Sequence, residues 1–356
     1  YDSLYVPAYG VMGTNQLRIG QMDAGRAALE RAFALDPFNL WHKNTLDLLD
    51  KMKTFRTIDR GRFRVVAPPE EADLLALYIV PLLEQAYDSL AVRYGYKPPT
   101  PIRLEFYRYH ADFSVRTVGL AGLGALGVSF GSLLAMDTPN GREKGQFNWG
   151  STAWHELTHA FTLGASDHRV PRWLSEGLSV LEERRVGRGW GADATVSYVL
   201  AMANGTLRPI SQLSDGFLRP RFPEETQFSY YAASLFCEMV EASRGAAALP
   251  AMLKGYRDGM DTPGVFQKVL GTTPRQIDAE FEAYTQRKFA LALAAVRGAT
   301  PNDSSGGKFV ATMREGVAKM GSDRNAARAL FEQARAMFPE YGGEDGPSWY
   351  LAEMAR

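Results

Sequence analysis

The chain has 356 residues, of which 46% are hydrophobic and 22% charged, and its formal net charge is zero. This length allows more than one domain with a sizeable core, and the neutral balance argues against nucleic-acid binding as the main function. A single cysteine, Cys237, excludes an intrachain disulfide and, next to Phe236 in an apolar run, has the setting of a core residue.

The sequence begins Tyr-Asp-Ser, without an initiator Met or an apolar leader. We therefore expect a mature or trimmed chain whose targeting signal lies outside it. The absence of disulfides fits the cytoplasm but also a bacterial cell envelope or periplasm, so the compartment stays open.

Residues 9–52 have the periodicity of helices, and the helical pattern of 24–35 ends at Asp36-Pro37. Several small and large residues have spacings close to those of a tetratricopeptide repeat, namely Tyr9, Met12, Gly13, Gly25, Leu29, Ala32 and Pro37. Generic amphipathic hairpins are the alternative. In either case the helices must stack on other elements to bury their apolar faces, and they are a candidate surface for a protein partner.

The next segment predicts strands and one long helix. Residues 62–67, 102–107 and 131–137 have strand patterns, and 71–94 has a helical pattern that Pro81 is expected to kink or divide. From residue 150 to about 296 the pattern is almost entirely helical. The expected fold class is therefore α+β, with a small mixed sheet, a mainly helical part and flanking repeat-like helical hairpins.

Residues 117–136 carry no charge over 20 positions, which is long enough to cross a bilayer. Five glycines interrupt the segment, and no aromatic or basic belt flanks it. This composition favours a glycine-rich loop leading into a strand, and we expect no integral membrane span.

A polar stretch at 299–307 precedes the C-terminal segment, where Ala327, Phe331, Ala334 and Pro339 repeat part of the N-terminal pattern. We therefore expect three domains. Residues 1–57 form tetratricopeptide-like helices, residues 60–296 form a central domain with a strand-rich part (60–147) and a helical part (148–296), and residues 308–356 form C-terminal repeat-like helices.

The stretch Trp-His-Glu-Leu-Thr-His at 154–159 uses two of the chain's five histidines. On a helix capped by Ser151 or Thr152, His155 and His159 would lie on one face, about 6 Å apart, and could bind one metal ion. Imidazole suits zinc, and Glu156 would point to a neighbouring side, where it can deprotonate a metal-bound water. The alternative is two hydrogen-bonded core histidines.

A catalytic zinc ion usually has three protein ligands, so a third residue is needed. The downstream candidates are Asp167, His168, Glu176, Glu182 and Glu183. Asp167 and His168 lie in an expected loop, whereas Glu176 begins the next helical run, which can turn back toward the first helix. Glu176 is therefore the predicted third ligand.

The sequence HELTH at 155–159, followed by PRWLSEGL at 171–178, resembles the gluzincins, which are zinc metallopeptidases with an HExxH motif and a downstream glutamate. It looks most like the peptidase MA-like domains that accompany tetratricopeptide repeats in bacteria, and the resemblance covers roughly residues 60–290. It implies a zincin-like domain and one Zn²⁺ per chain held by His155, His159 and Glu176. It also implies hydrolysis of a peptide or protein substrate with Glu156 as the general base.

The resemblance implies two further roles. Glu183, seven residues after Glu176, matches a carboxylate that orients a histidine ligand in related zinc aminopeptidases, although it also fits a solvated charge. Tyr231 matches a tyrosine that stabilises the tetrahedral oxyanion, and its neighbour Tyr230 leaves that assignment open.

The chain lacks the GxMEN strand of the zinc aminopeptidases, so the resemblance does not imply an exopeptidase. The strand Gly131 to Asp137 is the candidate for pairing with an extended peptide at a sheet edge, and Gly127 to Gly131 would let the backbones approach closely. The loop 164–172 and the glycine-rich segment 117–131 are expected to flank the site.

Two other function classes fit the same sequence. A catalytically silent domain could keep zinc for stability and bind proteins through its repeat-like helices, although such a scaffold has no need of Glu156. A zinc hydrolase acting on a non-peptide amide would use the same chemistry. His42 and His110 lie outside the motif and are expected to be ordinary surface or packing residues.

Overall fold

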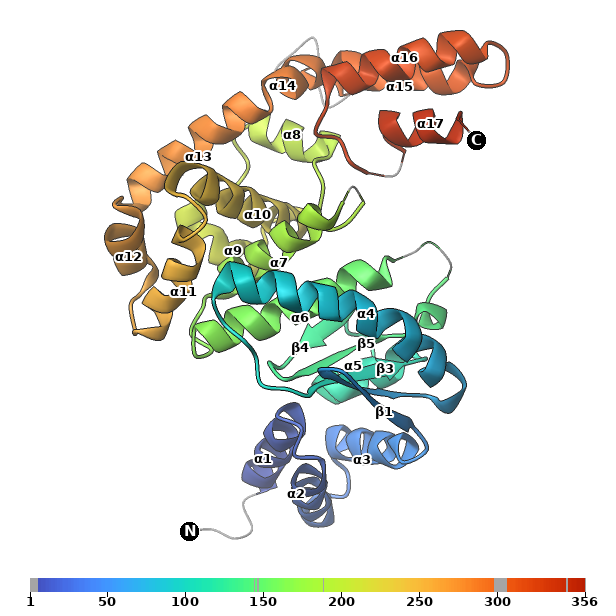
Figure 1. Ribbon diagram of the computed structural model, residues 1–356, viewed down its shortest axis with the longest axis vertical. Coiled ribbons are helices and arrows are strands. Elements are labelled where there is room, and N and C mark those ends of the chain that lie inside the picture. Colours follow the sequence, from blue (N-terminus) through green and yellow to red (C-terminus); the bar gives the residue numbers. More distant parts are fainter. Residues whose placement is uncertain are drawn as a thin grey trace. The chain divides into compact units, whose positions relative to one another are not determined.

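The computed structural model describes residues 6–143, 145, 147–187, 189–297, 306–343 and 345–355. These residues form a mainly helical α+β fold with a five-stranded mixed sheet (Figure 1), which confirms the predicted fold class. The chain divides into two units, Tyr1–His168 and Arg169–Arg356, and the five-stranded sheet belongs to the first. The finer division into three domains stays a prediction.

The sheet has the strand order β1-β2-β3-β5-β4, with β1 at Arg56–Arg60, β2 at Phe63–Ala67, β3 at Ile102–Tyr107, β4 at Gly127–Ser129 and β5 at Leu133–Asp137. β2, β3 and β5 are parallel, whereas β1 and β4 pair antiparallel with their neighbours. The three parallel strands lie where strands were predicted. The sequence did not predict β1, which is polar and mostly exposed, or β4, which has three residues within the glycine-rich segment.

Three helices pack against the sheet, namely α4 (Pro69–Tyr94), α5 (His110–Val118) and α6 (Trp149–Ala165). Alternate residues of β3 point to opposite faces and therefore meet different helices. Phe106 lies beside Leu83 of α4 and Ala153 of α6. Glu105 bonds to α5, and Tyr107 contacts an N-terminal helix. One face of the sheet thus carries α6, with the two motif histidines, and the other carries α5 and the N-terminal helices.

α4 continues through Pro81, so this proline does not divide the helix. Among the described residues, α4 is the one helix that is long and apolar enough to cross a bilayer, and it packs against β1, β2 and α6 as a core helix does. The uncharged segment 117–136 instead completes α5 and then forms a loop, β4 and most of β5. The loop-and-strand interpretation of this segment is therefore confirmed.

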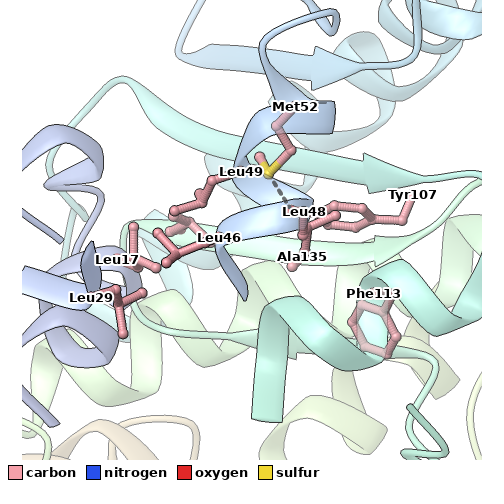
Figure 2. Close-up of a cluster of buried hydrophobic side chains, with 10 residues drawn as sticks. Leu17, Leu29, Leu46, Leu48, Leu49, Met52, Tyr107, Phe113 and Ala135 are labelled. Atoms are coloured by element: carbon pink, nitrogen blue, oxygen red, sulfur yellow. Dashed lines mark hydrogen bonds between the residues drawn. The ribbon is translucent and has the colours of Figure 1, made fainter. Parts of the chain in front are cut away.

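The N-terminal helices α1 (Val6–Arg18), α2 (Met22–Leu35) and α3 (Leu40–Met52) share a hydrophobic core with the sheet (Figure 2). Leu48 and Leu49 of α3 belong to the same buried cluster as Tyr107 of β3 and Phe113 of α5. These helices therefore bury their apolar faces on the sheet domain, while their membership of a repeat family stays a prediction.

A buried ion pair joins α5 to the sheet. Arg116 Nε donates to Glu105 Oε2 at 2.7 Å, and the two side chains are 1% and 0% exposed. Arg116 Nη2 also donates to the carbonyl of Leu17 in α1 at 2.9 Å. Burial opposes the charge on Glu105, but Arg116 and Arg103 outweigh it and hold the pKa of that carboxyl below its ordinary value. The pair thus links the first helix, α5 and β3.

The second unit contains α7 (Arg172–Val186), α8 (Val196–Ala203), α9 (Leu213–Leu218), α10 (Glu225–Arg244), α11 (Ala248–Arg257), α12 (Thr262–Val265), η3 (Phe266–Leu270), α13 (Pro274–Lys288), α14 (Ala290–Val296), α15 (Gly307–Lys319), α16 (Arg324–Met337) and α17 (Pro347–Glu353). α7 packs along α10, where Trp173 meets Phe236 with 5.3 Å between ring centroids. Most of the predicted linker, residues 299–305, lies outside the described residues.

We predict that Arg116→Met lowers the free energy of unfolding by about 3–5 kcal/mol, because it leaves the buried Glu105 carboxylate without its strongest partner. Lys43→Met is the control, since the exposed i,i+4 pair of Lys43 with Asp47 contributes at most about 0.5 kcal/mol. Urea unfolding monitored by circular dichroism measures both.

The same pair predicts a pH dependence. Because the folded-state pKa of Glu105 is lowered, its contribution is present above the ordinary glutamate pKa and is lost as the pH falls through the folded value. Unfolding of Glu105→Gln should therefore depend less on pH below about 4.5 than unfolding of the wild type. Equal pH slopes for the two proteins would contradict this assignment.

Candidate metal centre

The helix that carries the motif begins one residue after Asn148. The Asn148 side chain accepts a hydrogen bond from the Ser151 N–H at 3.0 Å, which identifies it as the N-cap. The sequence-based expectation of Ser151 or Thr152 as the cap was wrong, because both residues already lie within the first turn of α6.

His155 and His159 lie one helical turn apart on α6 and are both half-buried. Their Nε2 atoms are 3.0 Å apart, and the ring centroids are separated by 4.7 Å. Both imidazoles therefore direct the same nitrogen to one point. This is the arrangement that two histidines at i and i+4 need in order to share one ion.

Glu176 lies in the second turn of α7 and is 8% exposed. Glu176, His155 and His159 each offer one ligand atom, and these atoms all lie within 4.8 Å of one another. Two imidazoles and one carboxylate are a donor set that suits a transition metal ion. The three residues predicted as ligands thus form a group that could hold a metal ion.

The other proposed ligands are not part of this group. Asp167 and His168 are exposed and have left-handed φ values of 52° and 58° in the loop after α6. Glu182 bonds to Arg185 at 2.6 Å. Glu183 is 7% exposed, which disagrees with a solvated charge, and it lies two helical turns beyond Glu176 on the same face of α7.

Glu156 is 6% exposed and lies against Gly127 of β4. A Cβ atom placed on Gly127 of β4 would lie 2.8 Å from both Cγ and Oε1 of Glu156, and 2.9 Å from Thr152. The missing side chain of Gly127 therefore leaves the space that the Glu156 carboxyl occupies. Glu156 stands outside the group of three ligand atoms, as predicted for a base rather than a ligand.

The strand predicted to pair with a peptide does not lie at the edge of the sheet. β5, within the segment Gly131 to Asp137, is paired on both sides, with β3 and β4, so its backbone cannot accept another strand. β4 is the outer strand. The Phe130 N–H donates to Leu133 O, and the Asp137 N–H donates to Leu126 O. In an antiparallel ladder, hydrogen-bonded and non-hydrogen-bonded residue pairs alternate along each strand. Because Leu126 and Phe130 bond to β5, the N–H and C=O groups of Gly127 and Ser129 point away from β5.

Tyr231 is 4% exposed within an aromatic cluster. Its ring lies 4.9 Å from that of Tyr198 and 6.4 Å from that of Phe289, and the Arg184 guanidinium lies 5.2 Å from its ring centre. Burial raises the pKa of the Tyr231 phenol well above its ordinary value, against the opposing charge of Arg184. These contacts are those of a packing residue.

Tyr230 is half-buried. It lies near Arg172, the arginine that pairs with Glu176. Arg172 Nε donates to Glu176 Oε1 at 3.1 Å. Burial opposes the charge on Arg172, but Tyr230 and Glu176, each by charge and by a hydrogen bond, raise the pKa of its guanidinium. Of the two tyrosines, Tyr230 is therefore the one that lies near the predicted ligand Glu176.

The sequence missed a polar cluster that involves His110. Its Nδ1 lies 2.9 Å from Asp137 Oδ2, and its Nε2 lies 2.5 Å from the carbonyl oxygen of Leu123. Arg142 also donates to Asp137 Oδ2 at 2.8 Å. His110 thus ties the glycine-rich segment to the end of β5. No local motif marks it, because its partners are 13 and 27 residues away.

No family model matches the chain, and no curated protein matches it significantly. The two motifs, and the geometry of the residues that they contain, are the features of the chain that point to a function.

We predict that His159→Ala weakens binding of a divalent metal ion, measured with Zn²⁺ as the probe, more than about 100-fold, since loss of even an indirect partner of a ligand typically costs 10–100-fold. His168→Ala, which changes an exposed histidine of the loop, should bind as the wild type does. Calorimetric titration should give one ion per chain, with affinity falling on acidification because the imidazoles must be neutral. Equal binding by His159→Ala and the wild type would remove this group as the site.

Proposed function

We propose that this protein is a zinc-dependent peptidase that hydrolyses peptide bonds with Glu156 as the general base. The observation that carries the proposal is the grouping of His155, His159 and Glu176, which belong to the two motifs that resemble gluzincins. When bound, zinc would act as a Lewis acid that lowers the pKa of water and polarises a carbonyl oxygen.

Glu156 supplies the proton transfers in this proposal. It follows His155 directly on α6, and its carboxyl is confined by Gly127 and is largely shielded from solvent. Such a carboxylate can accept a proton from the attacking water and return it to the departing amine. A scaffold that kept zinc only for stability would not need this residue.

Tyr230 supplies the proposed hydrogen bond to the oxyanion. Its phenol lies next to Arg172, which in turn bonds to Glu176. A phenol O–H held in this way can donate to oxygen as negative charge develops on it. We assign this role to Tyr230 because Tyr231 is enclosed by Tyr198, Phe289 and Arg184.

The outer strand β4 supplies the proposed contact to the substrate backbone. Gly127 and Ser129 direct their N–H and C=O groups away from β5, and Gly127 abuts the Glu156 carboxyl. An extended peptide added to this edge would run past the proposed base. This supports peptides over non-peptide amides as the substrate class.

We predict that Glu156→Gln lowers hydrolysis of a mixed peptide library at least about 100-fold, since general acid–base catalysis contributes that much or more. Zinc content should stay at the wild-type level. Glu71→Gln is the matched control, because Glu71 is equally buried, at 6%, and bonds to Arg108 and Asn140. Undiminished cleavage by Glu156→Gln would refute the proposed role, and absence of cleavage by the zinc-loaded wild type would favour the scaffold.

We also predict that Gly127→Ala lowers turnover on the order of 10- to 100-fold without loss of zinc, because the added methyl group displaces the Glu156 carboxyl or the strand. Gly124→Ala is the matched control in the same segment, where an added Cβ has no atom within 4 Å. Neither glycine has a left-handed φ, so backbone strain is not a factor. Steady-state kinetics with a peptide from the library would separate the two variants, and equal rates would argue against β4 as the substrate edge.

A further inference from the structure

Arg172 occupies a position in α7 that its charge does not favour. It is the first residue of the helix, where the macrodipole disfavours a cation, and its side chain is 53% exposed. Neither the HExxH motif nor the downstream glutamate calls for an arginine here. A residue that departs from a local preference in this way is often retained for function.

The contacts of Arg172 join two groups that the proposed reaction uses. Its Nε donates to Glu176 Oε1 at 3.1 Å, one helical turn along α7. The phenol of Tyr230 in α10 lies close enough to raise the pKa of the same guanidinium. The guanidinium lies 5.6 Å from the ring centre of Phe217, whose ring in turn lies 4.9 Å from that of Tyr230. Arg172 is thus held by three side chains from three helices.

The shape of the guanidinium matters for this connection. Its planar fork can bond two partners in fixed directions at once, whereas a lysine ammonium is a point charge on a flexible stem. Glu176 has two carboxylate oxygens, and the bond of Arg172 to Oε1 restricts how the carboxylate turns. The same guanidinium lies over the Phe217 ring, which packs edge-on against the Tyr230 ring, so one cation stands beside both the carboxylate and the tyrosine.

We propose that Arg172 is a positioning residue that fixes the Glu176 carboxylate for metal binding and holds the Tyr230 phenol for the oxyanion. The part that concerns Tyr230 rests on the proposed function. The part that concerns Glu176 does not, since metal binding is measured without catalysis. The proposal predicts two separate effects of one substitution, one on zinc affinity and one on kcat.

The primary test compares Arg172→Met with Arg221→Met. Arg221 has similar contacts but is not one of the residues around the metal group. It forms an i,i+4 pair with Glu225, lies 5.9 Å from the ring centre of Phe222, and has a side chain that is 48% exposed. Arg172→Met should weaken zinc binding about 10-fold, as expected for a residue that orients a ligand. Electrostatic repulsion alone predicts tighter zinc binding by Arg172→Met, because the substitution removes a positive charge near the metal ion. Unchanged or tighter binding would overturn the first half of the proposal.

The second test uses kinetics at saturating zinc. Arg172→Met should lower kcat about 10-fold or more with little change in KM, and Arg172→Lys should not restore it, since a lysine keeps the charge but not the fork. In a Tyr230→Phe background, Arg172→Met should lower kcat less than twofold further, because both act through the same phenol. Additive losses, or full rescue by lysine, would overturn the second half.

The outcomes also separate this inference from the proposed function. If the wild type binds zinc but cleaves no peptide, the peptidase proposal fails, and the comparison of zinc affinities still decides whether Arg172 orients Glu176. If zinc does not bind, the orientation of a ligand has no meaning and both fail. If peptides are cleaved and Arg172→Met behaves as Arg221→Met does, the peptidase proposal stands and the inference about Arg172 is wrong.

Discussion

The packing of α6 fixes the direction in which its two histidines point, and the candidate site depends on it. Leu157 and Phe161 of this helix are fully buried, and the Phe161 ring meets Tyr87 of α4 with 5.1 Å between centroids. With this side of the helix buried, the half-buried face that carries His155 and His159 is left for a ligand. Apolar packing on one side of α6 thus determines where the two imidazoles lie.

The opposite face of the sheet supports this arrangement. Tyr107 belongs to the core shared with the N-terminal helices (Figure 2), while its neighbour Phe106 packs toward α6. The Arg116–Glu105 pair anchors α5 and α1 to the same strand. The helices that resemble repeats in the sequence therefore complete the core of the sheet domain.

Periodic patterns and local motifs could be predicted from the sequence, whereas long-range pairing could not. β3 was predicted at its observed bounds because six alternating residues are flanked by prolines and polar residues. The pairing of His155 with His159 was predicted from their spacing, and Glu176 was added because it begins the next helical run. The outer strand β4 has three residues and no alternation to detect, so β5 was mistaken for the edge. The choice between Tyr230 and Tyr231 needed the contacts of both side chains, because adjacent helical residues differ by about 100° in direction.

The glycine that follows Glu176 explains why α7 and α10 place Tyr230 where it is. A Cβ on Gly177 would lie 2.7 Å from the backbone of Ala233, so only glycine permits this approach of the two helices. The two helices are parallel at this contact. Before Gly177, Arg172 of α7 meets Tyr230 of α10, and after it Arg184 bonds to Glu238. Tyr230 lies one turn before Ala233, and the close approach therefore brings its phenol to the first turn of α7. A larger residue at position 177 would push α7 and α10 apart at Ala233. The Tyr230 phenol would then move away from Arg172, even though the substituted residue lies on neither side chain's position.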